Sequence, residues 1–490
     1  MLGLAVGAAA GYLGKPTLPA ETITNTETVT STVTETGTAA PLTTTAAGFD
    51  YATVGKQFSG QTVTVLVETG TRMDKWLAMV APQWQALTGI VIQPLPMAFT
   101  QMGQAVLTDF AGKVGAYDII YMVNFWGGLM AVGDHFNPME DLISAYPDLH
   151  DPTFVPELFL KKHMDLVGYW DVQKGINGTG KFTLVSVFPD SFMYFYRKDW
   201  FENPEEKDAF KSQYGHELTA PQTWDEHNEI AEFFTRPDKK MYGTTLNGKL
   251  DSADFWAYFL SHGGNIWKYS DTWPPVNFTP NLDSPETINA LNEVKKQLKW
   301  APPGALGYGQ VEYTDSFITQ DIAQAPACWF FMGGKCLDKS ISKVADKTGF
   351  GITPGNIPEN AGRVILGGWG AGVSRYSKLT KAAFLTIEYL VSEAINKKQV
   401  LSGFMSPVRT DLYSDPELLS SQPYVAMQGE TLKSAVSHHF NFLTNSFDFI
   451  TITQEEGTAA ITGKKTPEQA AKDIQSRLLD DIKRSGYKTD

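Results

Sequence analysis

Acidic, amide and aromatic residues stand together at the ends of several apolar segments of this sequence. A carbohydrate presents apolar C–H faces between its hydroxyl groups, so a site for one needs aromatic rings together with carboxylates and amides. Nine candidate site residues supply this combination: Glu68, Thr69, Asn124, Phe125, Trp126, Asp190, Gly368, Trp369 and Phe447. The residue types therefore indicate a binding site for a polyhydroxylated ligand.

The first five of these residues follow predicted parallel strands. Apolar alternation predicts strands over Gln61–Val67, Ile90–Leu95 and Tyr117–Val123, and helical spacing predicts helices over Arg72–Leu87 and Phe99–Phe110. A β-α-β-α-β order gives a parallel sheet with right-handed crossovers. Ligands of such sheets bind beyond the carboxyl ends of the strands, where these residues are expected.

Asp190 and Trp369 stand at two further breaks in the apolar pattern. The apolar run Phe182–Phe188 stops before Pro189-Asp190, and an aromatic run follows it. Trp369 lies between Gly368 and Gly370, and residues without side chains let another group approach the backbone closely. Both side chains are expected to be partly solvated ligand contacts. The alternatives are a backbone cap or turn for Asp190 and internal packing for Trp369.

Five motifs in a fixed order give the sequence a specific resemblance from about Gln61 to its C-terminus. It resembles the family 1 extracellular solute-binding proteins, the maltose-binding-like receptors of ABC importers. The motifs are the apolar strand with Tyr196-Arg197-Lys198-Asp199, Pro221-Gln222-Thr223-Trp224-Asp225-Glu226, the glycine-rich 364–374, Gly403 to Arg409, and Thr466-Pro467-Glu468. Arg197 replaces an asparagine of the family pattern.

The resemblance implies an α/β, two-lobed periplasmic-binding-protein-like fold (type II), with three interlobe crossings and the ligand in the cleft. The crossings are expected near residues 191–194, 367–373 and 406–409. The N-terminal lobe would comprise residues 60–190 plus 373–405, and the C-terminal lobe residues 191–372 plus 406–490.

The implied function is that of the extracellular substrate-binding protein of an ABC transporter. It would bind a sugar or oligosaccharide by hinge closure and deliver it to the permease transmembrane subunits. The resemblance places Asp190 where maltose-type receptors have a ligand-binding acid, Asn124–Trp126 where they place polar sugar contacts, and Phe447 near a stacking tryptophan. It implies a monomer with no cofactor and no metal, and not an enzyme.

The N-terminus differs in composition from the rest of the chain. Residues 1–15 include an apolar segment too short to span a bilayer, which is typical of a signal or anchor. Residues 16–48 are a predicted stalk, with twelve threonines between Thr22 and Thr45. This arrangement resembles archaeal binding proteins tethered to the cytoplasmic membrane at the cell surface.

Several other classes of function fit the sequence less well. The net charge of −14 argues against a nucleic acid or an anionic membrane surface as partner. The segment Gly175–Lys181 fits part of a P-loop, but Phe182 replaces the Ser or Thr that holds Mg²⁺, so a turn is the better interpretation. His438-His439 has no partner at metal-ligand spacing. Cys328 and Cys336 form either one disulfide or two buried thiols.

Three alternatives remain open from the sequence. A secreted glycan-active enzyme would carry a carboxylate pair across the cleft, and a structural surface protein would bind no soluble ligand. A receptor of the same family for a non-sugar solute would carry clustered Tyr or His for iron, or a basic pocket for phosphate.

The predicted stalk generates a first test. Deleting residues 16–48 should leave the melting temperature and the ligand affinity unchanged, because the segment has too few large apolar groups to pack. Calorimetric melts and titrations of the deleted and full-length proteins check this. A clear loss of either property would show that the segment belongs to the fold.

Overall fold

The computed structural model describes residues 49–69, 72–131, 133–171, 176–251, 253–269, 275, 277–403, 405–437, 440 and 442–490. The chain divides into Met1–Gly48 and the compact unit Phe49–Asp490, and only the second is described below. The predicted apolar segment 1–15, the predicted stalk 16–48 and His438-His439 lie outside the described residues.

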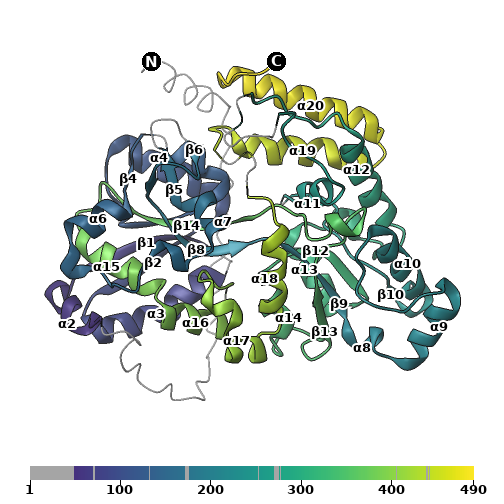
Figure 1. Ribbon diagram of the computed structural model, residues 1–490, viewed down its shortest axis with the longest axis horizontal. Helices are drawn as coiled ribbons and strands as arrows, with labels where there is room; N and C mark the ends of the chain where they lie inside the picture. The colour runs from purple at the N-terminus through teal and green to yellow at the C-terminus, as the bar shows by residue number, and fades with distance from the viewer. Residues whose placement is uncertain are drawn as a thin grey trace, which may run out of the picture. The chain divides into compact units, whose positions relative to one another are not determined.

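A six-stranded sheet forms the N-terminal lobe of this unit (Figure 1). Its order is β2-β1-β3-β14-β4, and β8 also pairs with β14. β1 is parallel to β2 and β3, whereas β14 runs antiparallel to β3, β4 and β8. The strands are β1 Thr62–Glu68, β2 Val91–Met97, β3 Ile119–Val123, β4 Phe136–Asn137, β8 Val185–Asp190 and β14 Gly367–Ser374.

Helices α3 (Arg72–Thr88) and α4 (Phe99–Gly112) connect the first three strands, so the predicted β-α-β-α-β order is confirmed. Apolar side chains of these helices and strands are buried in one core together with α15 (Thr380–Leu390). Because β1 and β3 are adjacent and parallel, their carboxyl ends lie at the same edge of the sheet.

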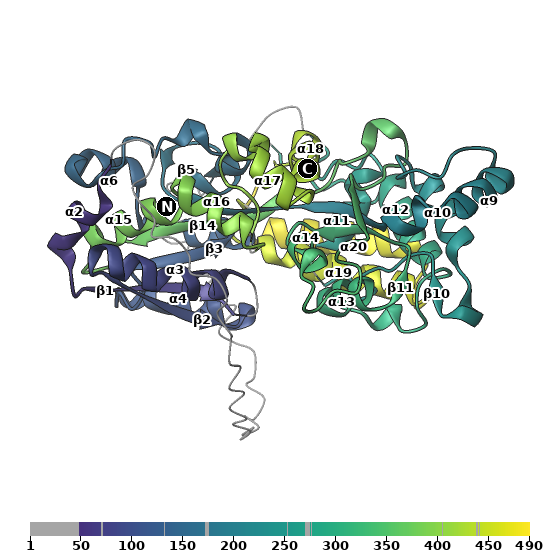
Figure 2. The same cartoon turned by 90° about the horizontal axis from the view of Figure 1, so that it is seen from below.

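A smaller antiparallel sheet forms the centre of the C-terminal lobe (Figure 1), and Figure 2 shows the helices of this lobe from below. β9 (Phe192–Arg197) lies between β12 (Gln324–Trp329) and β13 (Thr348–Gly351). The apolar run Ala327–Met332 is typical of one buried strand. The strand instead ends at Trp329, because Met332 begins helix α14 (Met332–Leu337).

Helices surround this second sheet and bury a second large core. Three of them begin with side-chain caps. Thr223 and Glu226 form a capping box, and the side chains of Ser284 and Thr466 cap helices that have proline at the first helical position. The principal helices are α10 Trp224–Phe234, α11 Asp254–Ser261, α12 Pro285–Gln297, α13 Gln310–Thr319, α18 Tyr424–Ser434, α19 Ser446–Ile461 and α20 Pro467–Arg484.

The remaining elements are short or peripheral. The helices are α2 Tyr51–Gly55, α5 Gly127–Ala131, α6 Met139–Ala145, α7 Lys161–His163, α8 Lys198–Phe201, α9 Pro204–Tyr214, α16 Glu393–Leu401 and α17 Pro416–Ser421. The strands are β5 Tyr169–Asp171, β6 Ile176–Asn177, β7 Lys181–Phe182, β10 Met241–Tyr242 and β11 Asp321–Ile322. Among the described residues, no helix combines the length and the apolar character needed to cross a bilayer.

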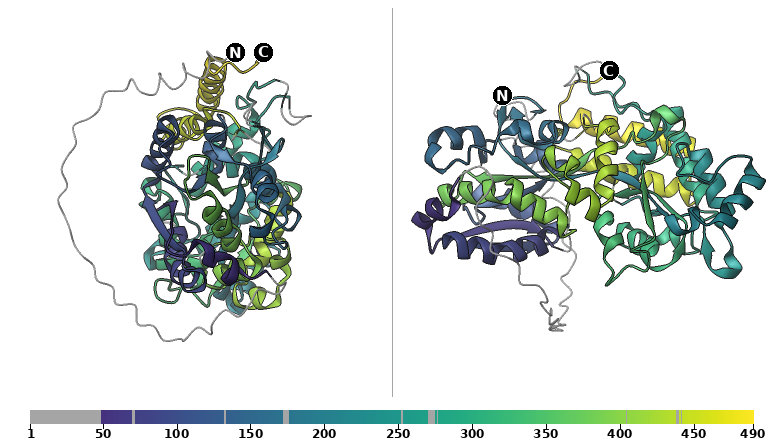
Figure 3. Two further views of the ribbon diagram at one scale, coloured as in Figure 1. Left: turned by 90° about the vertical axis from the view of Figure 1, so that its left-hand side faces the viewer. Right: turned by 60° about the horizontal axis from the view of Figure 1, so that its bottom comes forward.

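The chain passes between the two sheets at three places. The right-hand view of Figure 3 shows the two lobes side by side. Ser191 alone separates β8 in the first sheet from β9 in the second. The chain returns to the first sheet at Gly367, where β14 begins. It leaves again after Val408, because Met405 and Val408 are buried in the first core and Leu412 in the second. The lobe boundary predicted between residues 372 and 373 falls inside β14.

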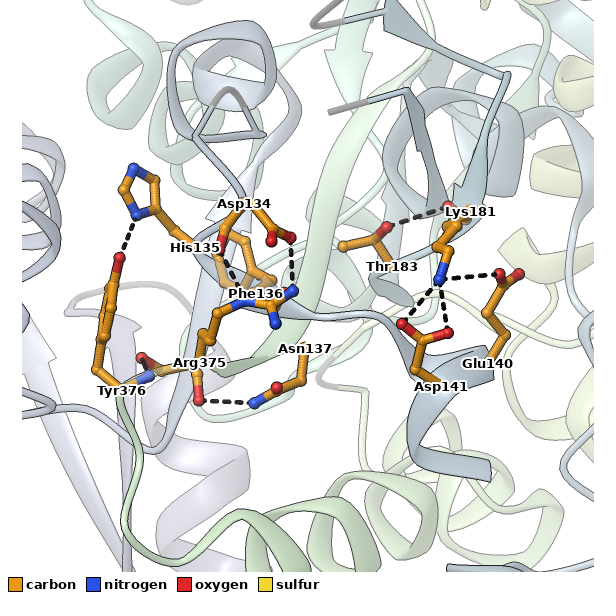
Figure 4. Close-up of polar contacts among 11 residues, drawn as sticks. Asp134, His135, Phe136, Asn137, Glu140, Asp141, Lys181, Thr183, Arg375 and Tyr376 are labelled. Atoms are coloured by element: carbon orange, nitrogen blue, oxygen red, sulfur yellow. Dashed lines mark hydrogen bonds and ion pairs between the residues drawn. The ribbon is translucent and has the colours of Figure 1, made fainter. Parts of the chain in front are cut away.

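The described residues of the segment that partly fits a P-loop, 176–181, run from β6 through a turn into β7 of a small sheet with the order β6-β5-β7. Lys181, the last residue of the pattern, is ion-paired with Asp141 at 2.7 Å and lies 3.9 Å from Glu140 (Figure 4). A strand rather than a helix begins at Lys181, so no helix N-terminus faces a phosphate there.

The cysteines and the asparagines of two Asn-x-Thr glycosylation motifs, Asn177-Gly178-Thr179 and Asn277-Phe278-Thr279, lie in packed positions. Cys328 and Cys336 are both free and buried. The amide of Asn177 donates to the Leu166 carbonyl (3.1 Å), and the amide of Asn277 donates to Asp490 (2.7 Å). Glycosylation at either asparagine would break one of these hydrogen bonds.

A buried ionisable network attaches α2 to the N-terminal lobe. The Tyr51 hydroxyl donates to Asp151 (2.8 Å), and the backbone N–H of Asp151 donates to Glu388 (2.8 Å). His150 Nδ1 lies 2.8 Å from the same carboxylate. Burial raises the pKa of Glu388 to about 7, and the hydrogen bond to Glu388 raises the pKa of His150.

This network predicts the pH dependence of stability. Both groups bind a proton more tightly in the folded than in the unfolded protein. Their contribution to the free energy of unfolding is therefore greatest at acidic pH and is lost as the pH rises through about 7. From about pH 5 to about pH 8, the free energy of unfolding of Glu388→Gln should fall less than that of the wild type, by on the order of 1 kcal/mol.

Urea unfolding at both pH values measures this difference. The control is Glu430→Gln, because the Glu430 side chain is 52% exposed. An equal pH dependence in wild type and Glu388→Gln would contradict the prediction.

Candidate functional site

Most of the predicted site residues lie at one edge of the first sheet. Glu68 ends β1, and Asn124 follows β3 as the first residue of the 3₁₀ turn η2 (Asn124–Trp126). β14 begins at the same edge, because Trp369 pairs with Val123 and Gly367 pairs with Asp190. The pairing of β1, β3, β8 and β14 thus brings together side chains that are up to 300 residues apart in the sequence.

Asn124 and Gly368 are joined by a hydrogen bond at this edge. The backbone N–H of Gly368 donates to Asn124 Oδ1 at 3.2 Å. Asn124 is fully buried, and its Nδ2 group has no hydrogen-bond partner among the described residues. Gly368 has φ +126°, and a Cβ atom there would lie 2.2 Å from the Phe188 carbonyl and 2.5 Å from His163 Nε2. Only glycine fits this position.

His163 lies beneath Gly368 and was not predicted from the sequence. Its Nδ1 atom is 2.7 Å from the Ser186 hydroxyl, and the side chain is completely buried. Burial lowers the pKa of His163 to about 3, with the backbone of Gly367 acting in the opposite direction. The imidazole is therefore neutral at physiological pH.

Four aromatic rings form a continuous cluster beside this edge. Trp126 and Trp369 meet edge to face, with ring centroids 6.0 Å apart. Phe99 stacks on Trp126 at 4.8 Å and lies 6.3 Å from Trp369. Phe447, at the start of α19, is 6.0 Å from Phe99. The structure thus brings together the predicted residues Trp126, Trp369 and Phe447.

Phe99 is the ring that the sequence interpretation missed. It is the first residue of α4, and helical spacing alone marks it as an ordinary helix position. The available signal was its place directly after a parallel strand, which it shares with Glu68–Thr69 and Asn124–Trp126.

Phe125 lies between the two cores. Its ring is nearly parallel to that of Phe440, with centroids 6.1 Å apart, and its carbonyl accepts a hydrogen bond from the Ser446 hydroxyl. The Phe125 side chain packs against both cores. Phe125 therefore contributes an interlobe contact through both its side chain and its backbone.

Glu68 and Thr69 lie at the end of β1. Burial, reinforced by the nearby charge of Asp74, raises the pKa of Glu68 to about 7. The backbone N–H of Thr69 donates to the Met97 carbonyl at 2.9 Å, and the residue is exposed. Glu68 therefore changes its charge near neutral pH and can either donate or accept a hydrogen bond there.

Asp190 is a buried carboxylate at the first crossing. Its Oδ1 atom accepts the backbone N–H groups of Ser191 (3.0 Å) and Phe330 (2.9 Å). Burial raises the pKa of Asp190 well above its usual range, although these two hydrogen bonds act in the opposite direction. The cap that the sequence left as an alternative is thus present in the structure.

The partial solvation expected of Asp190 and Trp369 is not found. The two residues are 7% and 6% exposed, respectively. Asp190 is enclosed because it lies between two sheets, and Trp369 because Phe99 and Trp126 cover it.

The side chains at this edge can form hydrogen bonds and apolar ring contacts. Among the described residues, no group of three or more His, Cys, Asp or Glu side chains is arranged to hold a metal ion. The chemistry available is the recognition of a ligand that carries both polar groups and an apolar face.

Comparison with known proteins identifies the family. The profile described as bacterial extracellular solute-binding protein matches residues 68–397. A probable amino-acid ABC transporter periplasmic-binding protein of Sinorhizobium fredii is 25% identical over 453 residues, covering 89% of this chain and 93% of that protein. A mannitol-binding protein of Pseudomonas aeruginosa is 25% identical over 405 residues, covering 78% of this chain and 84% of that protein.

Solved structures share the fold at lower identity. An ABC transporter solute-binding protein of Agrobacterium radiobacter, in complex with ribitol, has a TM-score of 0.71 and 21% identity, covering 86% of this chain and 99% of that one. A maltose-bound protein of T. maritima has a TM-score of 0.70 and 20% identity, covering 86% of this chain and 100% of that one. These structures show that the chain has the two-lobed fold. The profile match over residues 68–397 shows that the chain belongs to the bacterial extracellular solute-binding proteins.

Proposed function

We propose that this protein is the extracellular substrate-binding protein of an ABC importer and that it binds a neutral sugar or polyol between its two lobes. The observation that carries the proposal is the meeting of Asn124, Asp190, Trp126 and Trp369 at one edge of the first sheet. Carboxylate and amide groups hydrogen-bond hydroxyls, and aromatic rings cover C–H faces.

The ligands of related proteins support a polyhydroxylated ligand. Relatives are described as binding mannitol, ribitol and maltose, which are uncharged compounds rich in hydroxyl groups. A relative described as a probable amino-acid transporter component makes a non-sugar solute the second candidate. The membership of a solute-binding family supports binding rather than catalysis as the activity.

We assign roles to the nine predicted residues as part of this proposal. The side chains of Glu68, Thr69, Asn124 and Asp190 bond ligand hydroxyls, directly or by holding the neighbouring backbone in place. The rings of Trp126, Trp369 and Phe447 cover apolar faces of the ligand. Gly368 lets the ligand approach the backbone, and Phe125 closes the site from the side of the C-terminal lobe.

Ligand binding is proposed to close the lobes about the three crossings. We take the N-terminal lobe to be residues 60–190 plus 367–408 and the C-terminal lobe residues 191–366 plus 409–490, because β14 lies in the first sheet and Val408 in the first core. A micromolar site corresponds to about −8 kcal/mol. Several buried hydrogen bonds of roughly 1.5–3 kcal/mol each can supply this after the cost of closure.

The cellular setting completes the proposal. The protein acts as a monomer outside the cytoplasm, is tethered to the cytoplasmic membrane through residues 1–48, and presents the closed form to a permease pair. The family description as extracellular supports this location.

The proposed function predicts a ligand-dependent gain of stability. Mannitol, ribitol, maltose and a panel of neutral sugars should include a compound that raises the melting temperature, because a ligand at 100 times its dissociation constant adds about 2.7 kcal/mol. Calorimetric titration of that compound should give one site per chain. Stabilisation by amino acids alone would favour the non-sugar solute, and product formation from oligosaccharides would indicate an enzyme.

The position of Asp190 predicts that it stabilises the protein even without ligand. In Asp190→Ala, the buried N–H of Ser191 loses its acceptor, and the N–H of Phe330 keeps only its second acceptor, the Ser191 carbonyl, at 2.9 Å. This should lower the free energy of unfolding by about 1–3 kcal/mol. Asp190→Asn keeps an acceptor of the same shape and should lose less. Urea unfolding of the ligand-free variants measures both effects.

Asp225→Ala is the control for Asp190→Ala, because the Asp225 side chain is 92% exposed. If Asp190→Ala and Asp225→Ala unfold at the same urea concentration, the two backbone hydrogen bonds do not hold the first crossing together.

A further inference from the structure

Phe99 occupies the centre of the four-ring cluster, although neither the sequence motifs nor the family resemblance singles it out. Its ring lies 4.8 Å from Trp126 at an interplanar angle of 25°, 6.3 Å from Trp369 at 77°, and 6.0 Å from Phe447 at 42°. It is thus in contact with each of the three aromatic residues that we assign to the ligand.

The contact between Phe99 and Phe447 joins the two lobes. Phe99 begins α4, directly after β2 of the first sheet. Phe447 lies in the first turn of α19, which packs against α11, α12 and α20 of the C-terminal lobe. The neighbouring Ser446 hydroxyl also donates to the Phe125 carbonyl in η2. The start of α19 therefore faces the same sheet edge as the predicted site.

Neither ring is packed as an ordinary core residue. Phe447 is 38% exposed, and Phe99 is half-buried at a helix N-terminus, where helix formation does not require an aromatic side chain. By contrast, Trp126 and Trp369 are 7% and 6% exposed. Exposed aromatic surface from two lobes that meet at a proposed binding site provides two apolar faces for a ligand.

We propose that Phe99 is a specificity-determining residue that stacks on the apolar C–H face of a pyranose ring and closes on it together with Phe447. This inference rests on the proposed function and narrows its substrate class to cyclic sugars. A pyranose carries a contiguous flat C–H face, whereas a flexible acyclic polyol does not hold one. The sugar would separate the two rings, which now lie 6.0 Å apart, so that each ring contacts one face of the ligand instead of the other ring.

The test changes the aromatic ring at position 99 of the protein and compares cyclic with acyclic ligands. Phe99→Leu keeps an apolar side chain but removes the flat face, and Phe99→Tyr restores it. Titration calorimetry is carried out on the full chain with methyl β-D-glucopyranoside, maltose and mannitol. Phe99→Leu should weaken binding of the cyclic sugars by about fivefold or more, the loss expected for one stacking face. Phe99→Tyr should bind within about twofold of wild type.

Two further variants separate stacking from a general loss of structure. Phe447→Leu removes the opposite face at an exposed position and should also weaken binding of the cyclic sugars. Phe233→Leu is the matched control, because Phe233 is a partly buried phenylalanine packed in a separate core cluster. It should leave every affinity unchanged, and thermal melts of all ligand-free variants show that they are folded.

Three outcomes overturn the inference in distinguishable ways. If wild type binds a cyclic sugar and Phe99→Leu binds it equally well or more tightly, the Phe99–Phe447 contact is only an interlobe latch. If wild type binds mannitol but no cyclic sugar, the proposed function survives and this inference fails. If wild type binds none of these three compounds and none of ribitol and the wider panel of neutral sugars, the carbohydrate function fails and this inference fails with it.

Discussion

One buried carboxylate, that of Asp190, stabilises the junction between the two lobes. Asp190 is the last residue of β8, and its Oδ1 atom accepts the backbone N–H groups of Ser191 in the first crossing and of Phe330 just after β12. Ser191 in turn donates from its hydroxyl to Ile365, two residues before β14 begins, and accepts from Phe330. These bonds link the first two crossings to the second sheet. A buried acceptor that serves two N–H groups costs more to remove than an exposed one.

The same constraint positions the candidate site. Asp190 holds the end of β8 in place, and the pairing of β8 with β14 then sets the positions of Gly367, Gly368 and Trp369. The pairing of β14 with β3 places Trp369 opposite Val123, the residue directly before η2. The polar and aromatic groups therefore belong to the N-terminal lobe or to the crossing itself, and Phe447 is brought to them by the C-terminal lobe. Movement about the crossings would change the distance between Phe447 and the other rings while leaving those rings in place.

Much of this arrangement could be predicted from the sequence, because its signals are local. Alternation and helical spacing located β1, β2, β3, α3 and α4, and the motif from Pro221 to Glu226 contains the capping box of α10. The environment of Asp190 could not be predicted, because its partner Phe330 is 140 residues away and no local pattern reports that contact. The position of Phe99 after a parallel strand was a usable local signal, but its contacts with rings from η2, β14 and α19 are not local and could not be predicted.

The central claim is that the lobes close about these crossings on a neutral carbohydrate. Small-angle X-ray scattering of the protein with and without each of mannitol, ribitol and maltose at saturating concentration tests it most directly. At least one compound should lower the radius of gyration while the molecular mass from the forward scattering stays that of a single chain. A compound that binds in calorimetry but leaves the scattering curve unchanged would contradict closure, and no change with any carbohydrate tested would contradict the account as a whole.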